Sequence, residues 1–364
     1  MLDVYGKAVD LIDSGRCFAM AVILNTDGST PQETGVRALI EENGKTWGTL
    51  GGGIVEAEAQ RHALDACRSK RPNVVDLELK HAYSRDAMAI CGGHMRILID
   101  PTASKDRECY AQAAEARKRR ERGVLITTVR EASHADVAVQ WFAENDVSKA
   151  VGFPGADGIR ACLARESAQV FMADAPDPDA ALRGEGATAV LVEPVIPNPI
   201  LLIAGGGHIG QALARMAVPL GFVVTVVDDR PEFTHPALFP EGVTTRCGDT
   251  AKEVAGFPVT GDVFIVLVTR GHKQDAEALE ACIHTPAAYI GMIGSKRKVA
   301  MIRKNFIESG LATESEIERV FAPIGLDIGA VTVPEIATSI AAQLVAVRRQ
   351  GAAAVSSGRG GMAR

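Results

Sequence analysis

The chain lacks long apolar runs, an excess of basic charge and closely spaced cysteines. No apolar stretch approaches the ~20 residues that a membrane-spanning helix requires, so we expect no membrane partner. No opening segment combines a basic start, an apolar stretch and a small-residue cleavage site, so we expect a cytoplasmic protein. The formal net charge of −6 argues against a nucleic-acid binder, which would normally present a basic face.

Cysteine chemistry is also limited. The seven cysteines are odd in number, lie far apart and form no CxxC pair. This distribution suits reduced thiols in a cytosolic protein better than a disulfide framework or a structural zinc site, and we predict no metal site. The 364 residues, with 47% hydrophobic content, are instead sufficient for two or three packed cores of a soluble globular protein.

A glycine motif dominates the C-terminal half. Residues 201–210 read LLIAGGGHIG, where a short apolar run leads into Gly205-x-Gly207-x-x-Gly210 and then into a segment with helical apolar spacing. The first glycine permits a tight turn, the second lets a pyrophosphate approach the backbone, and the third lets helix and strand pack closely. The pattern predicts the strand, turn and helix of a Rossmann-type fold.

An acidic pair follows the next predicted strand. The apolar run at 222–227 ends in Asp228 and Asp229, and Asp228 lies eighteen residues after Gly210. In dinucleotide folds an acid near this place binds a ribose hydroxyl, so Asp228 is the candidate for that contact. The alternative that the residues leave open is a glycine turn in an α/β sheet that holds no dinucleotide.

Polar residues after the fourth predicted strand are expected to face the glycine loop. In the usual strand order 3-2-1-4-5 the first and fourth strands are neighbours, and ligands bind where their carboxyl ends diverge. This order brings His208, Arg270 and His272 around one crevice.

A basic cluster follows the fifth predicted strand. Ser295 is placed to cap a helix whose first turn carries Lys296, Arg297 and Lys298. Cations oppose the helix dipole at an N-terminus, and an anionic ligand would resolve that conflict. A solvated basic helix face is the alternative interpretation.

The first hundred residues contain two glycine-rich loops and one isolated cysteine. The loops at 28–37 and 48–53, the second followed by Glu56 and a helix, are suited to another anionic group, although a tight turn explains them as well. Cys91 stands beside two glycines that allow close approach to the backbone, or it is a small buried hydrophobic residue. Cys91 and His94 alone cannot form a metal site.

These patterns divide the chain into four parts. We predict an N-terminal α/β domain at 1–100, a middle segment at 101–198 that ends in a proline-rich linker, a Rossmann-like domain at 199–350, and a disordered tail at 351–364. The pattern predicts no particular fold for the middle segment. The predicted fold class is α/β, with a C-terminal doubly wound parallel sheet and a smaller N-terminal α/β domain.

Six segments together carry a resemblance to a known family. They are GSTPQETGVRA (Gly28–Ala38), GTLGGGIVEAEA (Gly48–Ala59), AICGGHMRI (Ala89–Ile97), AGGGHIG (Ala204–Gly210), YIGMIGSKRK (Tyr289–Lys298) and PIGLDIGAVTVPEIATSIAAQ (Pro323–Gln343). In this order they resemble the XdhC/CoxI family, which is associated with the maturation of molybdenum hydroxylases such as xanthine dehydrogenase. The resemblance implies that the chain binds molybdenum cofactor, protects it while a cysteine desulfurase supplies its sulfido ligand, and helps to insert it into the apoenzyme.

The resemblance and the glycine motif lead to one hypothesis about the site. The phosphate of molybdopterin, or the pyrophosphate of its dinucleotide form, is expected to bind at the glycine loop and the basic helix, with Asp228 on a ribose if one is present. The phosphate-binding residues would be Gly205, Gly207, His208, Gly210, Lys296 and Arg297. Cys91 is the candidate for contacting molybdenum or relaying sulfur, because a thiolate is both a nucleophile and a soft metal ligand. Its flanks offer no cation to lower its pKa.

Two other functions use the same residues. A nicotinamide-dependent oxidoreductase would bind NAD(P) at the glycine loop and use His208 or His272 as the acid or base. An interaction scaffold would retain the fold with a vestigial dinucleotide site. The sequence leaves the oligomeric state open, with a homodimer as the commonest arrangement among oligomers.

Overall fold

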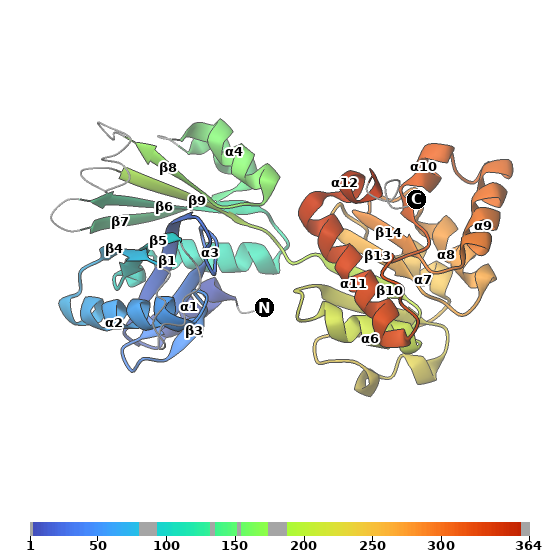
Figure 1. Ribbon diagram of the computed structural model, residues 1–364, viewed down its shortest axis with the longest axis horizontal. Coiled ribbons are helices and arrows are strands. Elements are labelled where there is room, and N and C mark those ends of the chain that lie inside the picture. Colours follow the sequence, from blue (N-terminus) through green and yellow to red (C-terminus); the bar gives the residue numbers. More distant parts are fainter. Residues whose placement is uncertain (1–2, 80–92, 132–134, 151–153, 174–187, 358–364) are drawn as a thin grey trace. The chain divides into compact units, whose positions relative to one another are not determined.

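The computed structural model describes the chain except for residues 1–2, 80–92, 132–134, 151–153, 174–187 and 358–364 (Figure 1). The chain folds into two compact units, residues 2–197 and residues 198–364. Within the described ranges, no helix combines the length and apolar character that crossing a bilayer requires.

The C-terminal unit is built on one parallel sheet of six strands. They are β10 (Ile200–Ala204), β11 (Val223–Asp228), β12 (Thr244–Cys247), β13 (Val263–Leu267), β14 (Tyr289–Met292) and β15 (Val320–Phe321). Their order is β12-β11-β10-β13-β14-β15, and all paired strands are parallel. This order confirms the predicted doubly wound fold and the adjacency of the first and fourth strands. The edge strand β15 is an addition that the sequence pattern does not predict.

Helices cover both faces of this sheet because its strands alternate two apolar sets. Leu201 and Ile203 of β10 pack on the side of α6 (His208–Ala217) and α11 (Val333–Gln350) (Figure 1). Leu202 of β10 packs on the opposite side, which is covered by three other helices. These are α7 (Thr250–Ala255), α8 (His272–Cys282) and α9 (Lys296–Glu308). The short helix α10 (Glu314–Glu318) precedes β15.

The predicted disordered tail is wrong over its first part. Residues Ala352–Ser357 form helix α12, and Ala352 and Val355 pack against the core beneath α6 and α11. Alanine has the highest intrinsic helix propensity, and these two apolar contacts add burial that the short segment would lack in isolation. Residues 358–364 lie outside the described residues.

The N-terminal unit begins with a five-stranded antiparallel sheet. Its strands are β1 (Phe18–Asp27), β2 (Arg37–Glu41), β3 (Thr46–Gly48), β4 (Asn73–Glu78) and β5 (His94–Asp100), in the order β3-β2-β1-β5-β4. Alternate residues of β1 serve two cores. Ala21 and Ile23 pack against α2 (Gly53–Ser69), whereas Met20 and Val22 face a second core that includes Leu11 of α1 (Val4–Asp13).

Residues after position 100 complete the same unit. They form a four-stranded antiparallel sheet in the order β7-β6-β9-β8, with strands β6 (Gly123–Glu131), β7 (Ala135–Ala143), β8 (Gln169–Ala173) and β9 (Thr188–Val195). Leu125 and Leu191 of this sheet join Met20 of β1 in one core, together with Tyr110 of α3 (Arg107–Lys118). Helix α4 (Gly155–Arg165) covers the other face. The structure therefore shows no division at residue 100, because the two sheets share buried apolar side chains.

Candidate functional site

The glycine loop lies at the carboxyl edge of the parallel sheet. Gly205 adopts φ +121°, and a Cβ there would come within 2.3 Å of the Val268 carbonyl oxygen at the end of β13. A Cβ at Gly210 would lie 2.0 Å from the Gly205 carbonyl oxygen, so the helix can pack on the loop only without a side chain. Gly207 has open space around its missing Cβ. The three glycines therefore have the geometry predicted from the motif, and the accessible one is Gly207.

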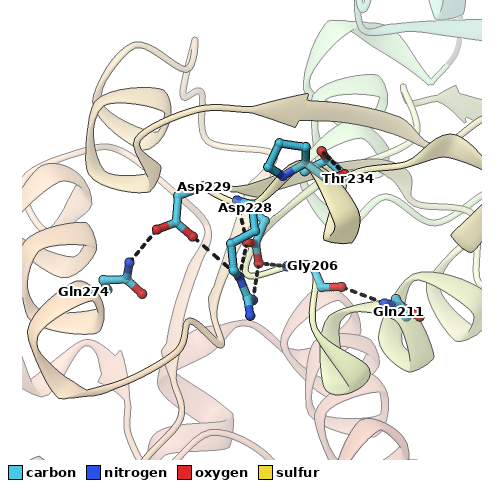
Figure 2. A network of polar contacts seen from close by, with 8 residues as sticks. Gly206, Gln211, Asp228, Asp229, Thr234 and Gln274 are labelled. Atoms are coloured by element: carbon cyan, nitrogen blue, oxygen red, sulfur yellow. Dashed lines mark hydrogen bonds and ion pairs between the residues drawn. The ribbon is translucent and has the colours of Figure 1, made fainter.

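Gly206 is covered by a turn that follows β11. A Cβ at Gly206 would lie 2.3 Å from the Phe233 carbonyl oxygen and 3.4 Å from the Asp228 Cβ. Phe233 ends the short 3₁₀ turn Pro231–Phe233. Figure 2 shows Asp228 directed toward Gly206. The turn after β11 therefore lies directly against the backbone of the glycine loop.

The Asp228 carboxylate is fully engaged by neighbouring donors. Its Oδ1 accepts hydrogen bonds from Arg230 N at 3.0 Å and Arg230 Nε at 2.8 Å. Its Oδ2 accepts from Gly206 N at 2.8 Å and Arg230 Nη2 at 2.9 Å. A carboxylate has about four acceptor positions, so these four donors use them all. The ribose contact predicted for Asp228 would require one of these bonds to break.

Charge on Asp228 is stabilised despite burial. Only 3% of the residue is exposed, and burial alone would raise its pKa. Hydrogen bonds from the Arg230 guanidinium and the Gly206 amide outweigh burial and hold the pKa of Asp228 below its ordinary value. The Arg230 guanidinium also lies 3.9 Å from the centre of the Phe233 ring. Arg230 is not identified from the sequence, because the dinucleotide pattern specifies only an acid at the end of the second strand.

The neighbouring Asp229 lies between this pair and α8. Its Oδ1 is 3.7 Å from Arg230 Nε, and its Oδ2 accepts a hydrogen bond from Gln274 Nε2 of α8 at 2.9 Å, as Figure 2 shows. These contacts link the end of β11 to the first turn of α8. Asp229 is therefore a contact between elements at the carboxyl edge, and it is exposed.

Asp275 fixes the backbone at the end of β13 and was not predicted. It is completely buried in the first turn of α8, where its Oδ1 accepts hydrogen bonds from the amide and the hydroxyl of Thr269. Its Oδ2 forms an ion pair with Lys298 Nζ of α9. One buried carboxylate thus holds the segment before Arg270 and the first turn of α9 together.

The predicted cap of α9 is present. Ser295 is the N-cap, and its hydroxyl accepts a hydrogen bond from Lys298 N at 3.3 Å. Lys296 and Arg297 occupy the first two helical positions and are exposed, and no acidic residue lies in the first turn. Neither forms an ion pair with a described residue, in contrast to Lys298. Among the three cations of the first turn, only Lys298 is therefore used structurally.

The other residues predicted at this edge differ in what the structure describes of their side chains. Arg270 is exposed in the segment after β13 and makes no ion pair within the described part of the chain. His208 is the first residue of α6 and is exposed. His272 begins α8, but its side chain lies outside the description. The carboxyl edge therefore presents His208, Arg270, Lys296 and Arg297, whereas Asp228 is occupied internally.

The glycine-rich loops of the N-terminal unit lie against one another. A Cβ at Gly51 would be 2.5 Å from the Pro31 Cβ, and one at Gly93 would be 2.5 Å from the Ser29 carbonyl oxygen. Glu56 accepts hydrogen bonds from Leu50 N at 3.1 Å and from the hydroxyl of Thr49. Glu56 therefore accepts from a backbone amide and a hydroxyl of the second loop, the kinds of donor that the predicted anion would use. Cys91 lies outside the described residues.

Arg37 is a core residue, which is a correction to its assignment to an anion-binding loop. Its Nε donates to Glu193 Oε1 at 2.7 Å, its Nη2 pairs with Glu193 Oε2, and Nη2 also donates to the Thr127 hydroxyl at 2.9 Å. Burial alone would lower the pKa of Arg37, but the Glu193 carboxylate raises it above its ordinary value. The pair joins β2 of one sheet to β9 of the other.

Comparison with known proteins gives two family matches. A sequence model of the XdhC Rossmann domain matches residues 201–344, and one of the XdhC and CoxI family matches residues 11–78. The two matches fall in different units of the fold, in the same order as the motifs.

Two curated proteins and one solved structure are similar over most of the chain. The uncharacterised protein YqeB of Escherichia coli K12 is 24% identical over 95% of this chain, which spans 46% of YqeB. A probable xanthine dehydrogenase subunit of Bacillus subtilis 168 is 24% identical, with 93% of this chain and 96% of that protein covered. A crystal structure described as a xanthine dehydrogenase from Bacillus halodurans has a TM-score of 0.74 at 22% identity, covering 96% of both chains, and shows the same fold.

Proposed function

Because this chain belongs to the XdhC and CoxI family, we propose that it is an accessory protein for a molybdenum hydroxylase of the xanthine dehydrogenase type. In this proposal the chain binds the molybdenum cofactor, holds it during sulfuration and delivers it to the apoenzyme. The Bacillus subtilis relative supports the association through its name, which describes a probable xanthine dehydrogenase subunit.

The observation that carries the binding proposal is the charge at the carboxyl edge. Arg270, Lys296 and Arg297 are exposed there without an ion-pair partner among the described residues, and the glycine loop at the same edge of the sheet is open at Gly207. Free backbone amides together with guanidinium and ammonium groups fit a phosphate group. These residues therefore suit the phosphate end of molybdopterin.

The first turn of α9 supports the same assignment energetically. Each cation at a helix N-terminus is unfavourable by about 0.3–1 kcal/mol, and α9 places two exposed cations at its first two positions. A bound phosphate would reverse the sign of this interaction, since both the cations and the helix amides would then face an anion. The arrangement favours a protein that is stabilised when its ligand is bound.

Sulfuration requires a second set of contacts. When bound, the molybdenum cofactor supplies the metal centre that the client enzyme uses in hydroxylation, and a cysteine desulfurase would supply the sulfido ligand. We propose Cys91 as the thiolate that contacts molybdenum or relays sulfur, because thiolates are soft ligands and nucleophiles. A homodimer would carry two such sites in one assembly.

The oxidoreductase alternative uses the same loop in a different way. An NAD(P) site would need Asp228 for a ribose hydroxyl or a nearby arginine for a ribose phosphate. All four acceptor positions of Asp228 are already used, three of them by Arg230. This occupancy disfavours NAD, whose ribose diol needs the acid, but it does not disfavour NADP, because Arg230 is itself a nearby arginine.

A transfer assay tests the proposal. The chain, isolated with its cofactor, is mixed with cofactor-free xanthine dehydrogenase from the same cells, and hydroxylation activity is followed with time. The double variant Lys296→Gln/Arg297→Gln is expected to lose activation about tenfold or more, because charged hydrogen bonds contribute about 1.5–3 kcal/mol each. Arg303→Gln, an exposed change further along α9, is the matched control.

Two outcomes of this assay would contradict the proposal. One is equal activation by the double variant and the control, and the other is activation of the apoenzyme without the chain. Cys91→Ser is tested in parallel. Unchanged cofactor retention together with unchanged activation would remove Cys91 from the mechanism.

A further inference from the structure

Two cysteines that lie far apart in the sequence meet at one end of the first antiparallel sheet. Side chains alternate along a strand, and Ala19, Ala21 and Ile23 of β1 face α2. Cys17 stands two residues before Ala19, and its carbonyl oxygen accepts a hydrogen bond from Glu42 N at 3.1 Å, which extends the pairing of β1 with β2. Cys17 therefore lies on the side of the strand that α2 covers.

Cys67 reaches the same place from the helix. It lies in the last turn of α2, at the end of the buried stripe that includes Ala59 and Ala63, and only 5% of it is exposed. Burial, together with the Cys17 thiol at hydrogen-bonding distance, raises the pKa of Cys67 to about 12. The two sulfur atoms are therefore neighbours, one on the strand side and one on the helix side of the same contact.

The two thiols differ in how accessible they are. Cys67 is buried, whereas Cys17 is exposed. Cys17 lines a shallow hollow at the start of β1, together with Arg16, Glu41, Glu42 and Asn43. A small uncharged oxidant can therefore reach Cys17 directly from solvent, and Cys67 is positioned to react with Cys17 alone.

We infer that Cys17 and Cys67 form a site of reversible oxidation, where a hydroperoxide converts the two thiols into a disulfide that joins β1 to α2. With hydrogen peroxide, the Cys17 sulfur attacks the O–O bond and becomes a sulfenic acid, and one water leaves. The Cys67 sulfur then attacks the Cys17 sulfur, and the hydroxyl leaves as a second water. The two thiols lose two electrons and two protons, which the peroxide takes up.

The disulfide would enclose both glycine-rich loops of the N-terminal unit. The loops at 28–37 and 48–53 lie between Cys17 and Cys67 in the sequence. A disulfide that closes a loop of the chain restricts the unfolded state, so we expect the oxidised unit to be more stable than the reduced one. This inference goes beyond the proposed function and does not depend on cofactor binding at the carboxyl edge.

Hydrogen peroxide is the probe for this site. The full chain is reduced, separated from the reductant, treated with hydrogen peroxide, alkylated and digested for mass spectrometry. We expect linked peptides that contain Cys17 and Cys67, about 2 Da lighter than the two reduced peptides together, and their loss on treatment with dithiothreitol. The thermal unfolding midpoint of the N-terminal unit should rise by about 5 °C or more on oxidation.

Single variants distinguish the roles of the two sulfur atoms. Cys67→Ala is expected to stop at the sulfenic acid on Cys17, which dimedone traps, and to give no linked peptides. Cys17→Ser should leave Cys67 reduced, because that thiol is buried. Cys247→Ser changes an exposed cysteine of the C-terminal unit and is the control, which should keep the linked peptides. Thermal unfolding before oxidation reports whether each variant is folded.

Four results would overturn the inference. One is the absence of linked peptides in a chain whose exposed Cys247 has been oxidised, and another is a disulfide between Cys17 and a second copy of the chain. The third is a link between Cys17 and Cys67 that forms only in urea. The fourth is a folded Cys67→Ala variant in which dimedone labels Cys17 no more than it does in the untreated protein.

Discussion

The two units use the charged residues of their motifs in opposite ways. In the N-terminal unit Arg37 is buried in a bidentate pair with Glu193, between the two sheets. In the C-terminal unit Lys296 and Arg297 are exposed in the first turn of α9, without a carboxylate partner among the described residues. A cation within a motif is thus part of the core in one unit and exposed in the other, where we propose that it faces the ligand. The distinction depends on partners and burial, which the sequence does not display.

The buried pair should dominate the stability of the N-terminal unit. Arg37→Leu leaves the Glu193 carboxylate buried without its partner, and we expect a loss of about 3–5 kcal/mol in the free energy of unfolding. Chemical denaturation measures this loss. Arg37→Leu/Glu193→Leu should recover much of it, because no unpaired charge remains.

The Arg37 variant also tests whether the cations of the two units have different roles. If Arg37→Leu left stability unchanged but weakened phosphate binding by the folded protein, Arg37 would have to be counted with the ligand-facing cations. The architectural role assigned to it would then be wrong.

Asp275 is a buried charge of the C-terminal unit that holds segments next to the exposed cations. Asp275→Asn removes the buried partner of Lys298 and weakens the bonds to Thr269, so we expect a loss of about 1–3 kcal/mol in stability. Phosphate binding should also weaken, because the segment before Arg270 and the first turn of α9 lose their common anchor. Urea denaturation and calorimetry measure the two effects.

The matched control for Asp275 is Glu277→Gln on the same helix. Glu277 is exposed, and its ion-pair partner among the described residues is exposed Lys273, so its replacement should change stability by less than about 0.5 kcal/mol. Equal effects of the two variants would show that the buried carboxylate has no special structural role.

Replacing an exposed cation of α9 should have the opposite effect on the free energy of unfolding. Lys296→Gln removes a charge that opposes the helix dipole, so the ligand-free chain should become more stable by about 0.3–1 kcal/mol at low salt. The same change should weaken phosphate binding. A stability loss together with unchanged binding would place Lys296 with the architectural charges.

The smallest expected effect is a pH dependence from Asp228. Its pKa in the folded chain is below the value of about 3.9 expected for an unfolded Asp, so its stabilising contribution is present above that value. The contribution is lost as the pH falls through the lower folded pKa. Urea midpoints of the wild type should therefore fall more between about pH 6 and about pH 3 than those of Asp228→Asn/Arg230→Gln. Parallel curves would contradict the assigned hydrogen bonds.

Much of the C-terminal fold follows from local patterns. Glycine spacing, apolar strands and intervening helices predict the sheet order, because parallel connections are right-handed and short. Strand β15 has only two residues, Val320 and Phe321, which is too short to produce a periodic signal. The sequence pattern predicts no fold for the middle segment, because one face of its sheet packs against β1 and α1, which are distant in the sequence.

The site was predicted only in part for a related reason. The roles of Ser295 and the glycines depend on residues close to them in the sequence, so their spacing identifies them. Asp275 resembles an ordinary acid in the first turn of a helix, and its burial depends on contacts with Thr269 and Lys298 from other elements. Arg230 has the same difficulty, since its effect on Asp228 requires the side chain to fold back over two residues.

The central claim is that the carboxyl edge of the C-terminal sheet carries a phosphorylated pterin. Mass spectrometry of the small molecule that accompanies the chain, purified from cells that make molybdenum cofactor, tests this claim directly. We predict a phosphorylated pterin in the wild type and in Arg303→Gln, and its loss from Lys296→Gln/Arg297→Gln. A nicotinamide dinucleotide in its place, or equal pterin in all three proteins, would contradict the account.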